Sequence, residues 1–151
     1  MQGISNIAGL MNIFGTGILA GILFLSAVGL RPAAAMLESA QQVILRQQLI
    51  QRLRTLMTPF MFLPIVASAL VLVWRETSSD WTLPVAALVF SVATIAVTVF
   101  VNVPLNWRFA GWSANNLHPD WQMYVRKWDR ANSIRFVFAL SAFACALFRG
   151  R

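Results

Sequence analysis

The side chains best suited to chemistry are concentrated between Asn102 and Arg135. Asn102 and Asn106 are four residues apart, and Trp128, Asn132 and Arg135 follow later with spacings of four and three. Such spacings place side chains on one face of a helix, provided that the last helix begins before Trp128. A guanidinium and several amides on one face can hold an anionic ligand or stabilise a developing oxyanion. We therefore expect this part of the chain to line a polar pocket.

These polar residues also have purely structural explanations. Pro104 disfavours a helical Val103, so the preceding helix should end near Asn102, and the asparagine amides could pair with its freed carbonyls. Arg135 lies one or two turns inside the last apolar segment, where it needs an anionic or carbonyl partner or must extend toward water. The carboxylates available on this side are those of Glu38, Asp120 and Asp129.

His118 and Cys145 restrict the other kinds of site. His118 is the single histidine, so it is a candidate general base or axial haem ligand, although a solvated loop histidine is an equally simple explanation. Cys145, the single cysteine, excludes an intrachain disulfide and a multi-cysteine metal site. One histidine and one cysteine cannot form a typical zinc site, so no protein-held metal is predicted apart from haem iron on His118.

The composition is that of an integral membrane protein. The chain has 151 residues with a mean hydropathy of +0.67, and 58% are hydrophobic whereas 11% are charged. In a soluble protein, a net charge of +7 would suggest that the partner is a nucleic acid. In an apolar chain it more simply marks the cytoplasmic side, so the expected partner is the lipid bilayer and no nucleic acid.

Four apolar segments are long enough to cross a bilayer: residues 7–30, 56–75, 82–103 and 131–148. They predict a single transmembrane domain over residues 1–151 that folds as an all-α four-helix bundle. Between the first two spans, residues 34–55 place Leu45, Leu49, Leu53 and Leu56 on one stripe, which predicts an interfacial helix or an extension of the second span. Pro59 and Pro64 should bend that span.

The basic residues are divided unequally between the two sides of the membrane. Three of the 12 (Arg75, Arg149 and Arg151) lie on the side of the termini, and the other nine lie on the side of the 31–55 and 102–130 connections or beside it. The positive-inside rule then places both long connections in the cytoplasm and both termini outside, in a bacterial inner membrane. Gly17 and Gly21 permit close helix packing, either within the subunit or across a homodimer.

The sequence resembles the anthrone oxygenase-like family of small four-helix membrane proteins. The resemblance rests on Asn102-Val103-Pro104-Leu105-Asn106 at the end of the third span and on Trp128, Asn132 and Arg135 at the start of the fourth. It implies oxidation of an anthrone-type phenolic ring by O₂ to a quinone, without a required metal or flavin. Family membership is broader than this chemistry, so it does not name the substrate.

The reaction that the resemblance implies suggests a role for each candidate residue, including His118 and Arg108, which are not part of the motifs that carry the resemblance. A phenolic anthrone loses a proton to give an enolate, which can pass an electron to O₂. The cradle for the enolate oxygen would comprise Arg135, Asn102, Asn106 and Asn132, the aromatic ring would stack on Trp128 and Trp107, and His118 would be the base. Arg108 lies near these residues and would complete the ligand-binding set.

Two other functions are compatible with the sequence. A haem- or quinone-binding protein for electron transfer or gas sensing would use His118 as the iron ligand, with haem b as the cofactor and Arg108, Arg126 and Arg135 near its propionates. The predicted spans contain no histidine, which does not favour a buried haem. A non-catalytic membrane accessory protein would need Arg135 for folding or partner binding, without turnover.

Overall fold

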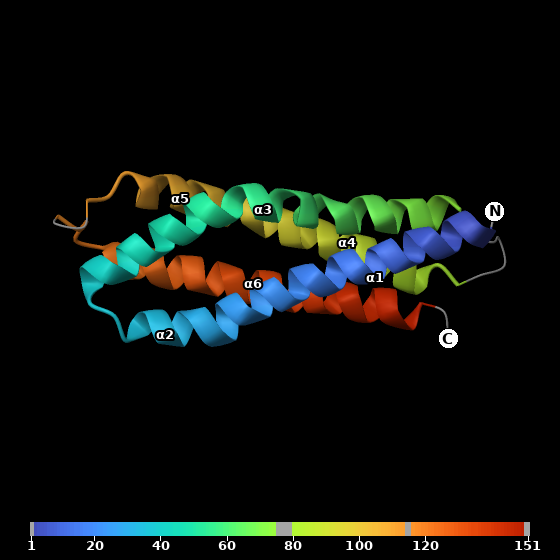
Figure 1. Ribbon diagram of the computed structural model, residues 1–151, viewed down its shortest axis with the longest axis horizontal. Coiled ribbons are helices and arrows are strands. Elements are labelled where there is room, and N and C mark those ends of the chain that lie inside the picture. The colour runs from blue at the N-terminus through green and yellow to red at the C-terminus, as the bar shows by residue number, and fades with distance from the viewer. Residues whose placement is uncertain (1, 75–79, 114–115, 150–151) are drawn as a thin grey trace.

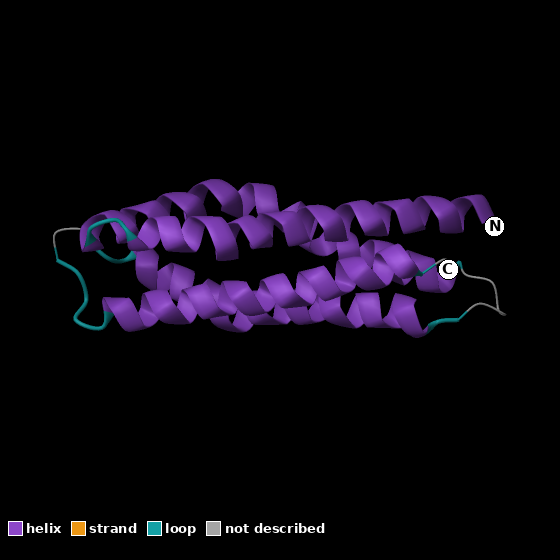
Figure 2. Cartoon of the chain, turned by 90° about the horizontal axis from the view of Figure 1, so that it is seen from below, coloured by secondary structure: helices purple, strands orange, loops and turns teal. Residues whose placement is uncertain are grey.

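The computed structural model describes residues 2–74, 80–113 and 116–149. Four helical units run alongside one another along the long axis of the molecule (Figure 1), and a view turned by 90° gives the same arrangement (Figure 2). The predicted all-α four-helix bundle is therefore confirmed. The elements are α1 (Gln2–Phe24), η1 (Leu25–Leu30), α2 (Arg31–Ala35), α3 (Ser39–Val73), α4 (Thr82–Val97), η2 (Thr98–Asn102), α5 (Val103–Ala110) and α6 (Trp121–Phe148).

The outside of the bundle is apolar, as expected of a protein that faces lipid. Each of the four helical units is long and apolar enough to cross a membrane. Large hydrophobic side chains are exposed along all of them, including Leu10 at 68%, Val73 at 71% and Phe100 at 79%. A soluble bundle would bury such side chains, so the chain is an integral membrane protein.

The helix α3 is one continuous helix of 35 residues. It joins the segment predicted at 34–55 to the span predicted at 56–75, so the extended-helix alternative is the one the structure adopts. A capping box between Glu38 and Gln41 begins it. The helix continues through Pro59 and Pro64. At 1.5 Å per residue it is about 52 Å long, which exceeds the thickness of the hydrocarbon core and carries one end out of the membrane.

Two widened helical turns each precede a proline. The π-helical segment η1 comes before Pro32, and η2 comes before Pro104. In each, the first residue after the segment donates its N–H five residues back, from Arg31 to the carbonyl of Ser26 and from Val103 to that of Thr98. The wider turn makes room for the proline ring, so the chain stays helical where sequence rules predict an end.

The prediction that the helix ends near Asn102 was therefore wrong. Val103 is helical at φ −61° and ψ −48°, and α5 continues to Ala110. The π turn satisfies backbone groups that the proline would otherwise leave unpaired. The proposed role of Asn102 as a cap for freed carbonyls loses its basis.

Small side chains let the helices approach closely in the core. Ala87 on α4 and Ala139 on α6 are fully buried, and Ala20 and Leu23 on α1 belong to the same buried interior. A Cβ added to Gly17 would lie 3.1 Å from the ring of Phe143, so this glycine serves packing within the subunit. Gly21 has open space beside it.

The first residues of α1 and the last residues of α6 lie at one end of the bundle (Figure 1). We call the opposite end, formed by residues 36–38, 111–113 and 116–120, the polar end. Arg75 and Arg151, which were predicted to mark the other side of the membrane, lie outside the described residues, as does Asn115 of the connection.

Candidate functional site

Polar residues interrupt the inward-facing stripe of α6. The buried positions of this helix follow helical spacing from Val125 to Ala146, and most of them are small or apolar. The exceptions are Asp129, Asn132 and Arg135, which are 8%, 3% and 8% exposed. Burial of these groups among membrane-spanning helices is costly unless each has a partner, so their partners define the site.

Asn102, Asn132 and Arg135 form one hydrogen-bonded group, which we call the amide–guanidinium cluster. The side-chain amide of Asn102 donates to Oδ1 of Asn132 at 3.1 Å, and Nη1 of Arg135 donates to the same oxygen at 3.0 Å. The oxygen Oδ1 of Asn102 and the Nε–H of Arg135 are buried without a hydrogen-bond partner. The cluster therefore has both a free donor and a free acceptor inside the protein.

No carboxylate neutralises Arg135 among the described residues. The three candidates from the sequence have other roles or positions: Glu38 caps α3, Asp120 is exposed before α6, and Asp129 pairs with Arg46. Of the two kinds of partner considered for Arg135, an anionic group or a carbonyl, the described residues provide a carbonyl, the side-chain amide oxygen of Asn132. Its neutral partner, Asn132, leaves the positive charge uncompensated, which favours an anion nearby.

Trp128 and Asn106 form the next layer toward the polar end. The indole Nε1–H of Trp128 donates to Oδ1 of Asn106 at 3.0 Å, which fixes the ring against α5. Phe109 packs edge-on against the same ring at 6.4 Å. Trp128, Asn132 and Arg135 share one face because α6 begins at Trp121, several turns before the predicted start of the span at 131.

An ion pair that the sequence did not reveal lies one turn from the cluster. Arg46 on α3 donates from Nη2 to both carboxylate oxygens of Asp129, at 3.3 and 3.2 Å, although the residues are 83 positions apart. Arg31 approaches from the other side, with its Nε 4.0 Å from Oδ2 of Asp129. Arg46 also lies over the Trp128 ring, 5.7 Å from its centre.

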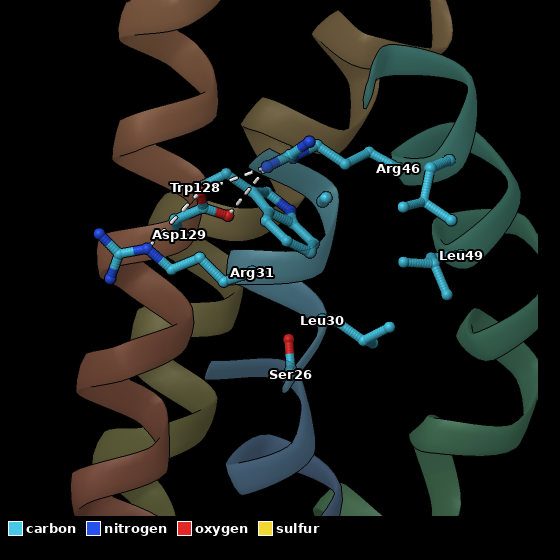
Figure 3. A pocket seen from close by; sticks show the side chains of 9 residues that line it. Ser26, Leu30, Arg31, Arg46, Leu49, Trp128 and Asp129 are labelled. Carbon is cyan, nitrogen blue, oxygen red and sulfur yellow. Dashed lines mark hydrogen bonds and ion pairs between the residues drawn. The ribbon is translucent and has the colours of Figure 1, made fainter. Parts of the chain in front are cut away.

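A pocket opens beside this ion pair (Figure 3). It is a shallow hollow, and its empty space of about 270 Å³ is counted together with the open solvent at its mouth. Charged groups lie at one end of it, and Leu30, Leu45 and Leu49 form apolar walls. Two of these leucines were predicted to form an apolar stripe of α3. The buried face of that part of α3 instead carries Val43 and Arg46, which are 0% and 3% exposed.

The length of α6 indicates how deep the pocket and Arg135 lie in the membrane. Trp128 is 20 residues from Phe148, which corresponds to about 30 Å of helix. This equals the hydrocarbon thickness, so the pocket beside Trp128 lies near the membrane boundary if α6 ends at the opposite boundary. Arg135 is seven residues deeper, or about 10 Å.

Three predicted site residues lie away from the cluster. His118 is exposed, stacks on Trp112 at 6.3 Å, packs against Tyr124 and accepts the backbone N–H of Asp120 at its Nδ1. Tyr124 is eleven residues before Arg135, about 16 Å along α6. The structure thus does not bring His118 and Arg135 together.

The other two of these residues are Arg108 and Trp107. Arg108 donates to the hydroxyl of Tyr124 at 2.7 Å and lies over its ring. Trp107 is 73% exposed on α5, so its ring faces outward.

The described residues do not form a typical metal or haem site. No group of three or more His, Cys, Asp or Glu side chains lies together in the described part of the chain. His118 is exposed and lies between α5 and α6, outside the candidate membrane spans. These residues offer no histidine ligand for a haem inside the bundle.

Comparison with known proteins identifies the family. No curated protein and no solved structure matches the chain significantly. The anthrone oxygenase family matches residues 47–145, a range that contains Asn102, Asn106, Trp128, Asn132 and Arg135. The match covers more than half of the sequence and confirms the resemblance that these residues indicated, so the chain belongs to the anthrone oxygenase family.

Proposed function

We propose that the protein is a membrane oxygenase that oxidises an aromatic, amphipathic phenol of the anthrone class with O₂. The observation that carries the proposal is the buried guanidinium of Arg135, which has a neutral partner and no carboxylate among the described residues. Family membership supports the reaction type. A positive charge held in a dry, low-dielectric site stabilises a nearby oxyanion much more strongly than the same charge in water.

The reaction has one intermediate that needs such a site. An anthrone loses a ring-methylene proton and becomes an enolate, whose charge is largely on oxygen. The enolate reduces O₂ by one electron, and the two radicals join at the former methylene carbon to give a peroxide anion. This anion takes back the proton removed in the first step, and the resulting hydroperoxide loses water to leave a carbonyl. One O₂ is consumed and one water is released for each quinone. The protein therefore accelerates the reaction by stabilising the enolate.

The cluster provides the groups for this task. In the proposal, the guanidinium of Arg135 and the second N–H of the Asn102 amide nitrogen donate to the enolate oxygen. Asn132 fixes the orientation of both groups through its shared Oδ1. Trp128 offers an aromatic surface for the ring system, and Asn106 fixes that indole. Trp107 and Arg108 are not assigned to the cradle because one faces outward and the other binds Tyr124.

Proton removal is assigned to Asp129 and not to His118. Asp129 is on the same helix as the cluster, one turn before Asn132, and it lines the pocket beside Trp128. His118 is exposed and packs against Trp112 and Tyr124. Proton transfer requires hydrogen-bond contact with the substrate or one bridging water, which Asp129 can provide to a ring seated on Trp128.

The test is turnover of dithranol, a dihydroxyanthrone, by the protein in nanodiscs. Consumption of O₂ and formation of the quinone are followed together, and the rate without protein is subtracted because anthrones oxidise spontaneously. Arg135→Gln should lower kcat by about 100-fold or more, as loss of an oxyanion donor does in other enzymes. Arg130→Gln removes the same charge from an exposed position of the same helix and should retain activity.

The same preparation distinguishes the alternatives. In one outcome, the wild-type protein gives no rate above the spontaneous one, and Arg135→Gln changes only folding or partner binding. This pair of results would favour an accessory role and refute the oxygenase proposal. A Soret band in the purified protein would instead favour haem binding. Comparable turnover by Arg135→Gln and Arg130→Gln would remove Arg135 from the mechanism.

A further inference from the structure

The pocket beside Trp128 has an excess of positive charge. Two guanidiniums, those of Arg31 and Arg46, face the single carboxylate of Asp129, so the group carries one net positive charge. A second anion in the pocket would complete the pairing. Arg31 is available to pair with it, because its 4.0 Å approach to Asp129 is long for an ion pair and its side chain is 51% exposed.

Arg46 adds an independent sign of a ligand. Its side chain is 3% exposed, and it donates to Asp129 and to the carbonyl of Gln42. Its Nε–H is nevertheless buried without a hydrogen-bond partner. A buried guanidinium that is costly to desolvate and incompletely paired is an expected feature of an anion-binding site.

The rest of the lining is apolar and aromatic. Leu30, Leu45 and Leu49 form the walls, and the Trp128 ring lies beneath Arg46 (Figure 3). The pocket is bordered by η1 and α2 on one side and by α3 on the other, with Trp128 and Asp129 of α6 between them. Its occupant should therefore have an acidic group at one end and a flat apolar body that reaches toward the bilayer.

We propose that this pocket binds a carboxylate-bearing aromatic amphiphile, with the carboxylate between Arg31 and Arg46 and the ring system against Trp128. As a statement about the substrate, this rests on the proposed function and adds an acidic substituent to the anthrone-class ring. Guanidiniums bind carboxylates with directed, charge-assisted hydrogen bonds, which a neutral substituent cannot replace. Arg31 is the specificity-determining residue because it is the accessible one.

Binding of two probes tests the inference without any turnover. Anthracenecarboxylate and its neutral counterpart anthracenemethanol are titrated into the protein in nanodiscs of phosphatidylcholine, and probe fluorescence gives each Kd. The wild-type protein should prefer the carboxylate by about ten-fold, the value of one additional charge-assisted hydrogen bond. Arg31→Gln should abolish the preference, whereas Arg31→Lys should retain part of it. Arg130→Gln is the matched control and should behave as the wild type.

Three results would overturn the inference. Equal affinity of the wild type for both probes would show that the pocket does not select a carboxylate. Equal loss of preference in Arg31→Gln and Arg130→Gln would show a general charge effect. Displacement of the carboxylate probe when phosphatidylglycerol is added to the nanodiscs would assign the pocket to an anionic lipid headgroup instead.

The probe experiment and the turnover experiment test the two proposals independently. If the preference for the carboxylate probe is absent but Arg135→Gln still lowers turnover of dithranol, the proposal of an acidic substituent is rejected and the oxygenase proposal stands. If the preference is present but the wild type gives no turnover, the pocket is still a binding site for an anionic amphiphile and the oxygenase proposal is rejected.

Discussion

The side-chain oxygen Oδ1 of Asn132 accepts hydrogen bonds from both Asn102 and Arg135, at 3.1 and 3.0 Å. One neutral oxygen thereby positions an amide from the third span and a guanidinium from the fourth. The arrangement orients Arg135 without neutralising it, which is the requirement for a preorganised anion site.

Replacing Asn132 by aspartate separates a structural role of Arg135 from an anion-binding role. In Asn132→Asp, a carboxylate oxygen would occupy the place of Oδ1 and form an ion pair with Arg135. Stability should be maintained because the buried charge acquires a partner. Turnover of dithranol should fall by about 100-fold or more because the cluster no longer carries a free positive charge. Wild-type turnover in this variant would contradict an oxyanion role.

The Arg46–Asp129 pair should be strongly coupled. Loss of either partner leaves a buried charge unpaired, so Arg46→Met and Asp129→Asn should each lower the free energy of unfolding by about 3 to 5 kcal/mol. The double variant should lose less than the sum of the two single losses, as judged by thermal unfolding in detergent. Arg31→Gln, which removes a half-exposed partner, should cost about 1 kcal/mol or less. Additive losses would show that the two side chains do not interact.

His118 should be dispensable for catalysis. His118→Gln should leave turnover within about two-fold of wild type because the ring is exposed and packs against Trp112 and Tyr124. Asp129→Asn should lower turnover in the folded fraction much more strongly, since Asp129 is the proposed base. A large loss of turnover in His118→Gln would reverse the two assignments.

Sequence patterns predicted the helices well because their signals are local. Apolar length determined the four spans, and spacing placed Trp128, Asn132 and Arg135 on one face of α6. The contact of Asn102 with Asn132 was compatible with that pattern, since both lie at the same end of neighbouring spans.

The other features depend on three-dimensional contacts that no local rule contains. The Arg46–Asp129 pair joins residues 83 positions apart. The three-residue spacing of Val43 and Arg46 was a weak sign in the sequence that both lie on the buried face of α3. The helical passage through Pro104 depends on the π turn η2, which is absent from simple proline rules.

Gly17 and Gly21 should differ in their tolerance of a larger side chain. Gly17→Leu should lower stability by about 1 to 3 kcal/mol because the new side chain would overlap the ring of Phe143. Gly21→Leu should be nearly neutral because nothing lies within 4 Å of a Cβ at this position. Thermal unfolding tests both. If Gly21→Leu instead converts a dimer to a monomer in native mass spectrometry, Gly21 forms the homodimer interface.

The orientation of the bundle can be tested with single cysteines in a Cys145→Ala background. The positive-inside rule predicts that the polar end lies in the cytoplasm, because nine of the 12 basic residues lie on its side or beside it. Asp80 lies at the end opposite the polar end, Gly111 lies at the polar end, and both native residues are exposed. A membrane-impermeant maleimide added to intact cells should label Asp80→Cys. It should label Gly111→Cys only after permeabilisation. The reverse labelling pattern would place the polar end outside. Substrate would then reach Arg31 and Trp128 from the outer leaflet, and the pocket would face the outer membrane boundary.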